Sequence, residues 1–340
     1  MLSSDPEISI AGEAANGSDA ADRVLALKPD IVIMDIDMPI MNGLEATARI
    51  ARASSIPVLI FTRNEEPELP FKAIERGAAD FLLKPDFNDI NRPDYVTSFI
   101  ARLRALASRH GHAPVATRER QSSHETKAAL AEAAPRDLGL PSPSSEPCPS
   151  RPSPAMIAVG ASTGGPQAVS SLLSSLKAPF PLPITLVQHI ETGFDKGYAD
   201  WLSDQTGHRV ILAKPGEEPR PGTVYVAPTD LHLIFSDSGF VLDDGLKVQN
   251  QKPSVDVLFR SAAERYGSHA LGILLTGMGS DGAEGCAAIQ AKKGFTVVQD
   301  EASSLIFGMP RAAIARGAAS LVLSLEKIGP YVASVVEGLP

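Results

Sequence analysis

The chain has 340 residues, enough for two domains, and 44% of them are hydrophobic, a share typical of globular proteins. Its formal net charge of -9, without a basic tract, argues against a nucleic-acid binder and against adhesion to an anionic membrane. The longest apolar runs are strand-sized, the N-terminus does not resemble a signal peptide and two cysteines cannot build a disulfide framework, so we expect a cytoplasmic protein without membrane insertion.

Short apolar runs alternate with helical patterns over residues 1–109, which we expect to form one domain. Such alternation predicts a parallel sheet with right-handed crossovers, the arrangement of an α/β domain. We expect strands over residues 8–11, 30–35, 57–61 and 81–84, and helices over 18–28, 44–53, 71–76 and 96–106, the first of them capped by Ser18.

Three polar side chains, Asp35, Thr62 and Lys84, fall at the ends of these strands. The carboxyl ends of parallel strands meet at one edge of a sheet, so we expect the three side chains to converge. A carboxylate that accepts a phosphoryl group, with a hydroxyl and an ammonium that bind its oxygens, explains the set better than a capping Asp, a strand Thr and a solvated Lys taken separately.

The segment 35–39, the turn 41–43, Thr62 and the pair 84–85 resemble the receiver domain of two-component response regulators. The resemblance implies a flavodoxin-like fold, phosphorylation of Asp35, switch roles for Thr62 and Lys84, and a Mg²⁺ ion held partly by Asp35 and Asp37. Family receivers open with a strand, an acidic pair that binds Mg²⁺ and a helix, whereas this chain begins at the end of that helix. We therefore expect a receiver without its first strand and helix, with weak Mg²⁺ binding and weak phosphorylation.

Residues 110–154 are rich in alanine, proline, serine and charged residues. Such a composition cannot bury enough apolar surface to fold, so we expect a flexible linker, with a short helix possible only over 125–133. A tether of this kind permits the N-terminal domain to dock on residues 155–340 and to release them.

The first turn of the domain expected over residues 155–340 carries a serine. An apolar run over 156–159 predicts a buried strand, and Pro166 suits the first turn of a helix over 167–176. The glycines between them allow a tight turn, so Ser162 lies in the turn that joins the strand to the helix. A hydroxyl there, among free main-chain N–H groups, can be a nucleophile, although a glycine-rich connector or an anion-binding nest explains the spacing equally well.

The rest of this domain predicts a doubly wound, mostly parallel sheet with one β-hairpin. We expect strands over residues 183–190, 222–227, 271–276, 295–299 and 319–323, a hairpin over 233–242, and helices over 255–266, from 308 onward and over 327–336.

His189 and Asp281 follow two of these strands, at the edge where Ser162 is expected. An imidazole can take the serine proton, and a buried carboxylate fixes the imidazole tautomer. The order Ser, His, Asp differs from the Ser, Asp, His order of α/β-hydrolases, which argues against that family. An alternative set joins Ser162 with Asp204 or Asp230 and with His232 or His269.

Five segments, residues 160–165, 188–189, 253–259, 275–282 and 299–304, resemble the catalytic domain of chemotaxis protein-glutamate methylesterases. The resemblance implies a catalytic triad of Ser162, His189 and Asp281, and oxyanion contacts near Thr163 and Met278. The roles of Asp256, His232 and Asp300 stay open.

The same resemblance implies hydrolysis of glutamate γ-methyl esters on chemoreceptors, with release of methanol, and deamidation of receptor glutamines through one acyl-serine route. Catalysis needs no cofactor, and the implied partners are methylated chemoreceptors and an upstream sensor histidine kinase. The unphosphorylated receiver is expected to cover the active-site face. A second hypothesis is a response regulator whose C-terminal domain only binds a partner, which needs glycine-rich loops but no triad.

Overall fold

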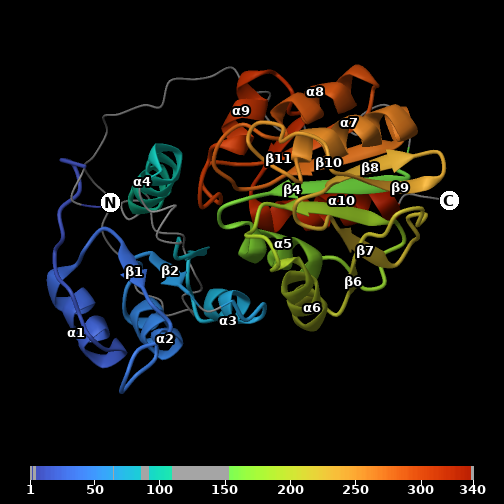
Figure 1. The fold of residues 1–340 in the computed structure, drawn as a ribbon. Coiled ribbons are helices and arrows are strands. Elements are labelled where there is room, and N and C mark those ends of the chain that lie inside the picture. The colour runs from blue at the N-terminus through green and yellow to red at the C-terminus, as the bar shows by residue number, and fades with distance from the viewer. Residues whose placement is uncertain (1, 3–4, 64, 86–91, 109–152, 338–340) are drawn as a thin grey trace, which may run out of the picture.

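The structure is a computed structural model that describes residues 2, 5–63, 65–85, 92–108 and 153–337 (Figure 1). The helices and strands before residue 108 lie together on one side of the molecule, and those after residue 153 form a larger body beside them. The expected linker and its helix over 125–133 lie outside the described residues, apart from residues 153 and 154.

The N-terminal part is a small parallel sheet, in the order β1-β2-β3, covered by helices. This confirms three of the four expected strands and all four expected helices, with ends shifted by no more than three residues. The elements are α1 (Gly17–Leu27), β1 (Val32–Met34), α2 (Gly43–Ala53), β2 (Val58–Thr62), α3 (Leu69–Glu75), β3 (Asp80–Leu83) and α4 (Pro93–Ala107).

Two expectations for this part are wrong. Residues 8–11 are irregular and mostly exposed, because within the described residues β1 pairs only with β2 and leaves this segment no strand to pair with. The cap of α1 is Asn16 and not Ser18: Asn16 has an extended backbone just before the helix, and its side-chain oxygen accepts the Asp19 N–H at 2.9 Å.

The C-terminal part is built on a seven-stranded sheet in the order β12-β11-β10-β4-β5-β7-β6, in which every pair is parallel. A separate antiparallel hairpin, β8–β9, confirms the expected one. The elements are β4 (Met156–Ala161), α5 (Gly165–Ser174), β5 (Ile184–Gln188), α6 (Asp195–Thr206), β6 (Arg209–Leu212), β7 (Thr223–Val226), β8 (His232–Ser236), β9 (Gly239–Asp243), α7 (Val255–Tyr266), a 3₁₀ turn (Gly267–His269), β10 (Ala270–Leu274), α8 (Ala283–Ala291), β11 (Phe295–Gln299), α9 (Met309–Ala315), β12 (Leu321–Leu323) and α10 (Leu325–Glu337).

Each face of this sheet is covered by its own layer. Helices α5, α6 and α10 lie on one face, and α7, α8, α9 and the hairpin lie on the other (Figure 1). Strand β4 is buried throughout, and its successive side chains serve the two layers in turn: Ile157 and Val159 join the first core, Met156 and Ala158 the second. The central strand therefore carries a continuous apolar run up to the turn that holds Ser162.

The two parts pack against each other through aromatic side chains. The Phe71 ring of α3 stacks on the Trp201 ring of α6, with centroids 5.6 Å apart. The Glu75 carboxylate accepts hydrogen bonds from Trp201 Nε1 and Gln205 Nε2, both at 2.7 Å. A side-chain carbon on Gly197 would lie 2.2 Å from the Pro67 carbonyl oxygen, so α6 can approach this closely only because residue 197 is glycine.

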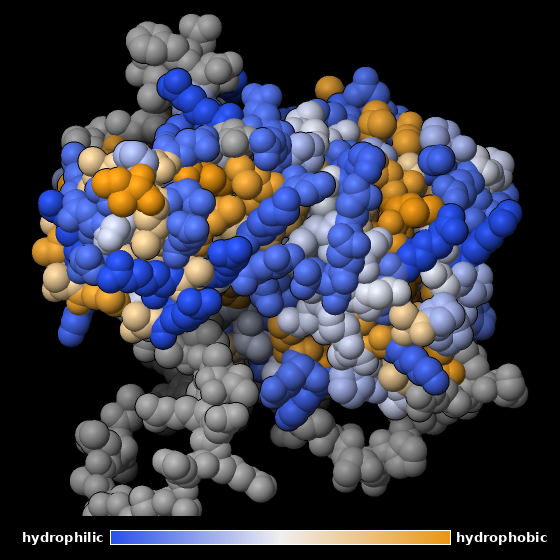
Figure 2. All heavy atoms as spheres, turned by 90° about the horizontal axis from the view of Figure 1, so that it is seen from below, coloured by the Kyte–Doolittle hydropathy of each residue, from blue (hydrophilic) through white to orange (hydrophobic). Residues whose placement is uncertain are grey.

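In the face shown by Figure 2, hydrophobic residues form several separate groups among hydrophilic ones. Among the described residues no helix combines the length and the apolar composition that a membrane span requires.

Candidate active site

Ser162, His189 and Asp281 follow three neighbouring strands of the large sheet, β4, β5 and β10. The hydrogen bonds between these strands continue past the strand ends as far as Ser162 and His189. The His189 N–H donates to the Ala161 carbonyl at 3.0 Å, and the Ser162 N–H donates to the Thr276 carbonyl at 3.0 Å. Because β4 lies between β5 and β10, the serine has the histidine loop on one side and the aspartate loop on the other.

The turn around Ser162 is held by hydrogen bonds to its own carbonyl. The Gly165 N–H donates to that carbonyl at 2.7 Å, and Gln188 Nε2 donates to it at 2.8 Å. Gly164 has a φ of 74°, which favours glycine and turns the chain into α5. A side-chain carbon on Gly277 would lie 2.8 Å from the Ser162 Cβ, so the loop after β10 passes against the serine only because residue 277 is glycine.

His189 and Asp281 are paired in a buried environment. His189 Nε2 lies 2.9 Å from Asp281 Oδ2, and the two side chains are 8% and 3% exposed. Since a carboxylate oxygen accepts, the imidazole donates through Nε2, which leaves Nδ1 without a proton in the neutral ring. Nδ1 is buried and has no hydrogen-bond partner among the described residues, so it is the ring nitrogen left free to act as a base.

The Asp281 carboxylate is stabilised by the N-terminus of α7. Oδ2 accepts the Val255 N–H at 2.8 Å, and Oδ1 accepts the Asp256 N–H at 2.9 Å and the Ser254 hydroxyl at 2.8 Å. Burial would raise the pKa of Asp281, but the His189 hydrogen bond and charge and these donors outweigh it and lower the pKa. Asp281 therefore remains an anion that can orient His189.

The Asp256 carboxylate, in the first turn of α7, stabilises the N-terminus of α8 in the same way. Its Oδ1 accepts the Gly282 N–H at 2.9 Å and the Gly285 N–H at 2.7 Å, in the first turn of α8. Its Oδ2 accepts Gln249 Nε2 at 2.7 Å. Burial raises the pKa of Asp256, the Gly285 N–H opposes this, and the negative charge of Asp281 raises the pKa further. Helices α7 and α8 thus exchange carboxylates, each stabilising the other's N-terminus.

The two expected oxyanion residues lie at the same edge. Thr163 is buried directly after Ser162, and Met278 is half-buried in the loop after β10. The main-chain N–H groups of both residues make no hydrogen bond within the described ranges. Both are donors at this edge that could meet a developing negative charge.

The alternative residues do not come together around Ser162. His269 is exposed, precedes β10 and binds the Ser153 carbonyl, so it lies at the opposite edge of the sheet. Asp204 and Asp230 are exposed on α6 and before β8. Asp300 accepts hydrogen bonds from Ser303 and shapes its own loop.

The receiver residues converge as expected. Asp35, Thr62 and Lys84 lie at the carboxyl ends of β1, β2 and β3, and the Lys84 ammonium forms an ion pair with Asp35. Asp37 is exposed, and in the described ranges no three His, Cys, Asp or Glu side chains gather where they could hold a metal ion. The described residues do not by themselves fit a Mg²⁺ ion, and the expectation of weak Mg²⁺ binding stays a prediction.

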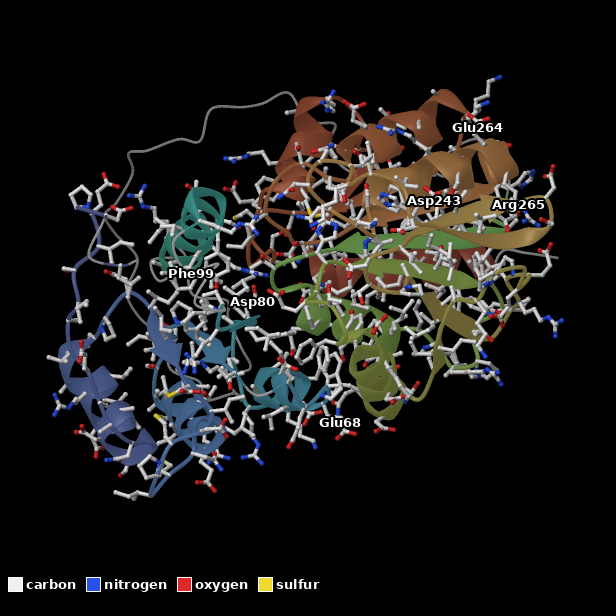
Figure 3. The ribbon with its side chains drawn as sticks, in the orientation of Figure 1. Glu68, Asp80, Phe99, Asp243, Glu264 and Arg265 are labelled. Carbon is white, nitrogen blue, oxygen red and sulfur yellow. The ribbon has the colours of Figure 1, made fainter. Side chains whose placement is uncertain are left out.

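The N-terminal part reaches the turn that follows Ser162. Asp80 of β3 forms a 2.8 Å ion pair with Arg102 of α4. Burial raises the pKa of Asp80, and the Arg102 charge, the Phe81 N–H and the nearby Thr163 side chain oppose that rise. Figure 3 shows Asp80 and Phe99 on the side of the N-terminal part that faces the larger body.

Apolar contacts surround this charged pair. Side chains of α4 and of the loops after β10 and β11 belong to one hydrophobic cluster, which joins the two parts directly beside the turn. Its members there are Phe99, Ile100, Leu103, Met278, Leu305 and Ile306.

Sequence reasoning missed three residues of this arrangement: Gln188, Ser254 and Arg102. Gln188 and Ser254 lie inside the segments 188–189 and 253–259 that carry the family resemblance. A serine before an apolar helix commonly caps that helix, but the Ser254 hydroxyl donates to Asp281 and does not cap α7. The contacts of Arg102 are long-range, and nothing in its local sequence indicates them.

The raised pKa of Asp256 predicts how stability changes with pH. The folded state holds a proton on Asp256 at pH values where the unfolded chain has released it, so this contribution to stability is present at low pH and is lost as pH rises through the folded pKa. In Asp256→Asn the side chain does not titrate. The free energy of unfolding of the wild type, minus that of the variant, should therefore be larger at about pH 4 than at about pH 7.

Urea denaturation at the two pH values measures this difference. The control is Asp204→Asn, on the exposed surface of α6, which tests whether any Asp-to-Asn change produces the trend. A difference that is unchanged or larger at pH 7 would contradict the raised pKa.

Comparisons with known proteins agree with this geometry. The sequence model of the CheB methylesterase family matches residues 157–332, and that of the response regulator receiver domain matches residues 1–92. A protein-glutamate methylesterase/protein-glutamine glutaminase of Methanospirillum hungatei is 37% identical, covering 99% of this chain and 93% of its own length. One from Pseudomonas putida is 38% identical, with 97% and 93% covered.

Among solved structures, the crystal structure of the Thermotoga maritima CheB methylesterase catalytic domain is 37% identical. The similarity covers 54% of this chain and all of that one, with a TM-score of 0.53. The chain therefore belongs to the CheB family of response regulators, which join a receiver domain to a methylesterase domain.

Proposed function

We propose that the chain hydrolyses glutamate γ-methyl esters on chemoreceptors, releasing methanol, and deamidates receptor glutamines, with Ser162 as nucleophile, His189 as base and Asp281 as the residue that orients the base. One observation carries the proposal. A buried carboxylate with a lowered pKa binds one nitrogen of a buried imidazole, at the strand ends that flank a serine turn. A module that only binds a partner has no need of such a pair.

In the first half of the reaction, the Ser162 hydroxyl attacks the γ-carbonyl carbon of the ester. Its proton passes to His189 Nδ1, the ring nitrogen that no described residue occupies. The imidazolium formed is stabilised by the Asp281 carboxylate 2.9 Å from Nε2. Collapse of the tetrahedral intermediate breaks the bond to the methoxy group, which takes the proton from Nδ1 and leaves as methanol.

In the second half, water replaces the alcohol. His189 Nδ1 takes a proton from the water as its oxygen attacks the acyl carbon, and then returns a proton to Ser162 Oγ as the acyl bond breaks. The product is a glutamate carboxylate. A glutamine side chain follows the same route with ammonia as the leaving group, so one site serves both activities.

The negative oxygen of each intermediate needs donors that are already in place. The main-chain N–H groups of Thr163 and Met278 are suited to this because they flank the serine turn and have no partner within the described ranges. The loop holding Met278 is held by hydrogen bonds, because the Gly277 carbonyl accepts the Gly308 N–H at 3.0 Å and the Met309 N–H at 2.9 Å. Donors on a rigid loop cost little reorganisation during the reaction.

Regulation by the receiver follows from the contacts beside the turn. Asp80, paired with Arg102, lies close to Thr163, and α4 packs in the cluster that contains Met278, so a docked receiver occupies the approach to the proposed oxyanion residues. Phosphorylation of Asp35 by a sensor histidine kinase in the cytoplasm would replace the Asp35–Lys84 ion pair with a bulkier dianion. That change at the end of β1 is the trigger proposed for release.

Replacing Ser162 tests the nucleophile. Ser162→Ala should lower kcat for methanol release by about 10³-fold or more, because the acyl bond can no longer form. Ammonia release from receptor glutamines should fall equally. Ser171→Ala, exposed on α5, is the matched control and should keep both activities. A loss below about tenfold at Ser162 would favour the partner-binding alternative.

Replacing Arg102 tests whether the docked receiver inhibits the esterase. Arg102→Ala leaves the buried Asp80 carboxylate without its cation, which weakens docking, so ester hydrolysis by the unphosphorylated chain should rise by about threefold or more. The matched control is Arg104→Ala on the same helix. The Arg102 charge also opposes the rise that burial causes in the pKa of Glu191 in the C-terminal part, whereas Arg104 forms its ion pairs with Asp5 and Glu7 of the N-terminal part. Initial rates of methanol release measure the activity of both unphosphorylated variants. Equal rates for the two variants would exclude Asp80–Arg102 as part of the cover.

A further inference from the structure

His232 is a buried histidine that the proposed reaction does not use. It is the first residue of β8 and is 2% exposed. Its Nε2 lies 2.9 Å from the Leu246 carbonyl oxygen, and its Nδ1 lies 3.2 Å from the Ser254 main-chain nitrogen. A carbonyl only accepts and an N–H only donates, so the ring is neutral, with its proton on Nε2.

Ser254 connects this histidine to Asp281. Its N–H is bound by His232, and its fully buried hydroxyl donates to Asp281 Oδ1 at 2.8 Å. The next two main-chain N–H groups, of Val255 and Asp256, also donate to Asp281. Three consecutive N–H groups are thus divided between an imidazole and a carboxylate, and the position of the first determines where the other two point.

The hydroxyl of Ser254 binds Asp281 and not the N-terminus of α7. Serine before a helix commonly caps it, but here the hydroxyl makes no cap hydrogen bond with α7. Asp281 takes the place of the cap. If Ser254 shifts, the carboxylate loses the hydroxyl donor and the alignment of the Val255 N–H, which shares Oδ2 with His189.

We propose that His232 is a positioning residue of the esterase, which holds the Asp281 carboxylate against His189 by fixing Ser254. The proposal rests on the proposed function of Ser162, His189 and Asp281. His232 touches neither His189 nor Ser162 through any contact in the described ranges, so its effect on the reaction passes through Ser254.

Two substitutions separate the two ring nitrogens. In His232→Asn the side-chain oxygen takes the place of Nδ1 and can still accept the Ser254 N–H. In His232→Gln the amide takes the place of Nε2, so it can still donate to the Leu246 carbonyl, but nothing accepts the Ser254 N–H. The Gln variant should lose about tenfold or more in kcat with KM changed less than about twofold, because a buried donor is left unpaired. The Asn variant should keep kcat within about threefold.

The proton shared by His189 and Asp281 supplies a readout independent of turnover. Its ¹H resonance, on Nε2, should persist in the wild type and in His232→Asn and should broaden or disappear by exchange in His232→Gln. Equal losses of kcat in the two variants, or an unchanged resonance in the Gln variant, would overturn the proposal. Because the resonance reports position and not catalysis, it separates this result from a failure of Ser162 as nucleophile.

A double-mutant cycle tests the route through Ser254. Ser254→Ala removes the hydroxyl that reaches Asp281 and leaves only the main-chain N–H groups of Val255 and Asp256 to respond to His232, so adding His232→Gln should lower kcat by a smaller factor than it does in the wild type. If the two losses multiply, His232 acts independently of Ser254 and the proposal is wrong.

Discussion

The negative charge of Asp281 is the constraint on which the rest of the site depends. A carboxylate that is 3% exposed stays charged only if its oxygens accept hydrogen bonds. Here both oxygens accept hydrogen bonds, from an imidazole, a hydroxyl and main-chain N–H groups. Most of these donors come from the start of α7. The fold therefore keeps the anion by placing a helix N-terminus against it, and the anion in turn determines which nitrogen of His189 carries the proton.

The exchange of carboxylates between α7 and α8 links this site to the packing of the domain. Asp281 binds the start of α7, and Asp256 binds the start of α8. Neither helix needs a side chain of its own for a cap, and sliding one helix along the other would leave both carboxylates unpaired. The stability of the domain and the orientation of the histidine thus depend on the same contacts, while the docked N-terminal part packs beside the serine turn.

Much of this could be predicted from the sequence, because the signals are local. Apolar runs mark the buried strands β4, β5 and β10, and the polar residues that follow them fall at one edge for any parallel sheet. Helices α6 and α8 and strand β6 were not predicted. Helix α8 consists largely of Ala and Gly, and the apolar residues of α6 are confined to a short stretch, 197–202, between polar ends, so neither helix gives a long apolar pattern. The roles of Ser254 and Arg102 depend on residues far away in the chain, and the irregular segment 8–11 shows that a strand pattern needs a neighbour to pair with.

The state of the His189 ring tests the central claim most directly. In ¹⁵N NMR of the full chain at neutral pH, the account predicts that the two ring nitrogens differ, with the proton on Nε2 in slow exchange and Nδ1 unprotonated. In Asp281→Asn this arrangement should be lost while the chain stays folded. A proton on Nδ1 in the wild type, or the same tautomer in both proteins, would contradict the claim that Asp281 orients the base.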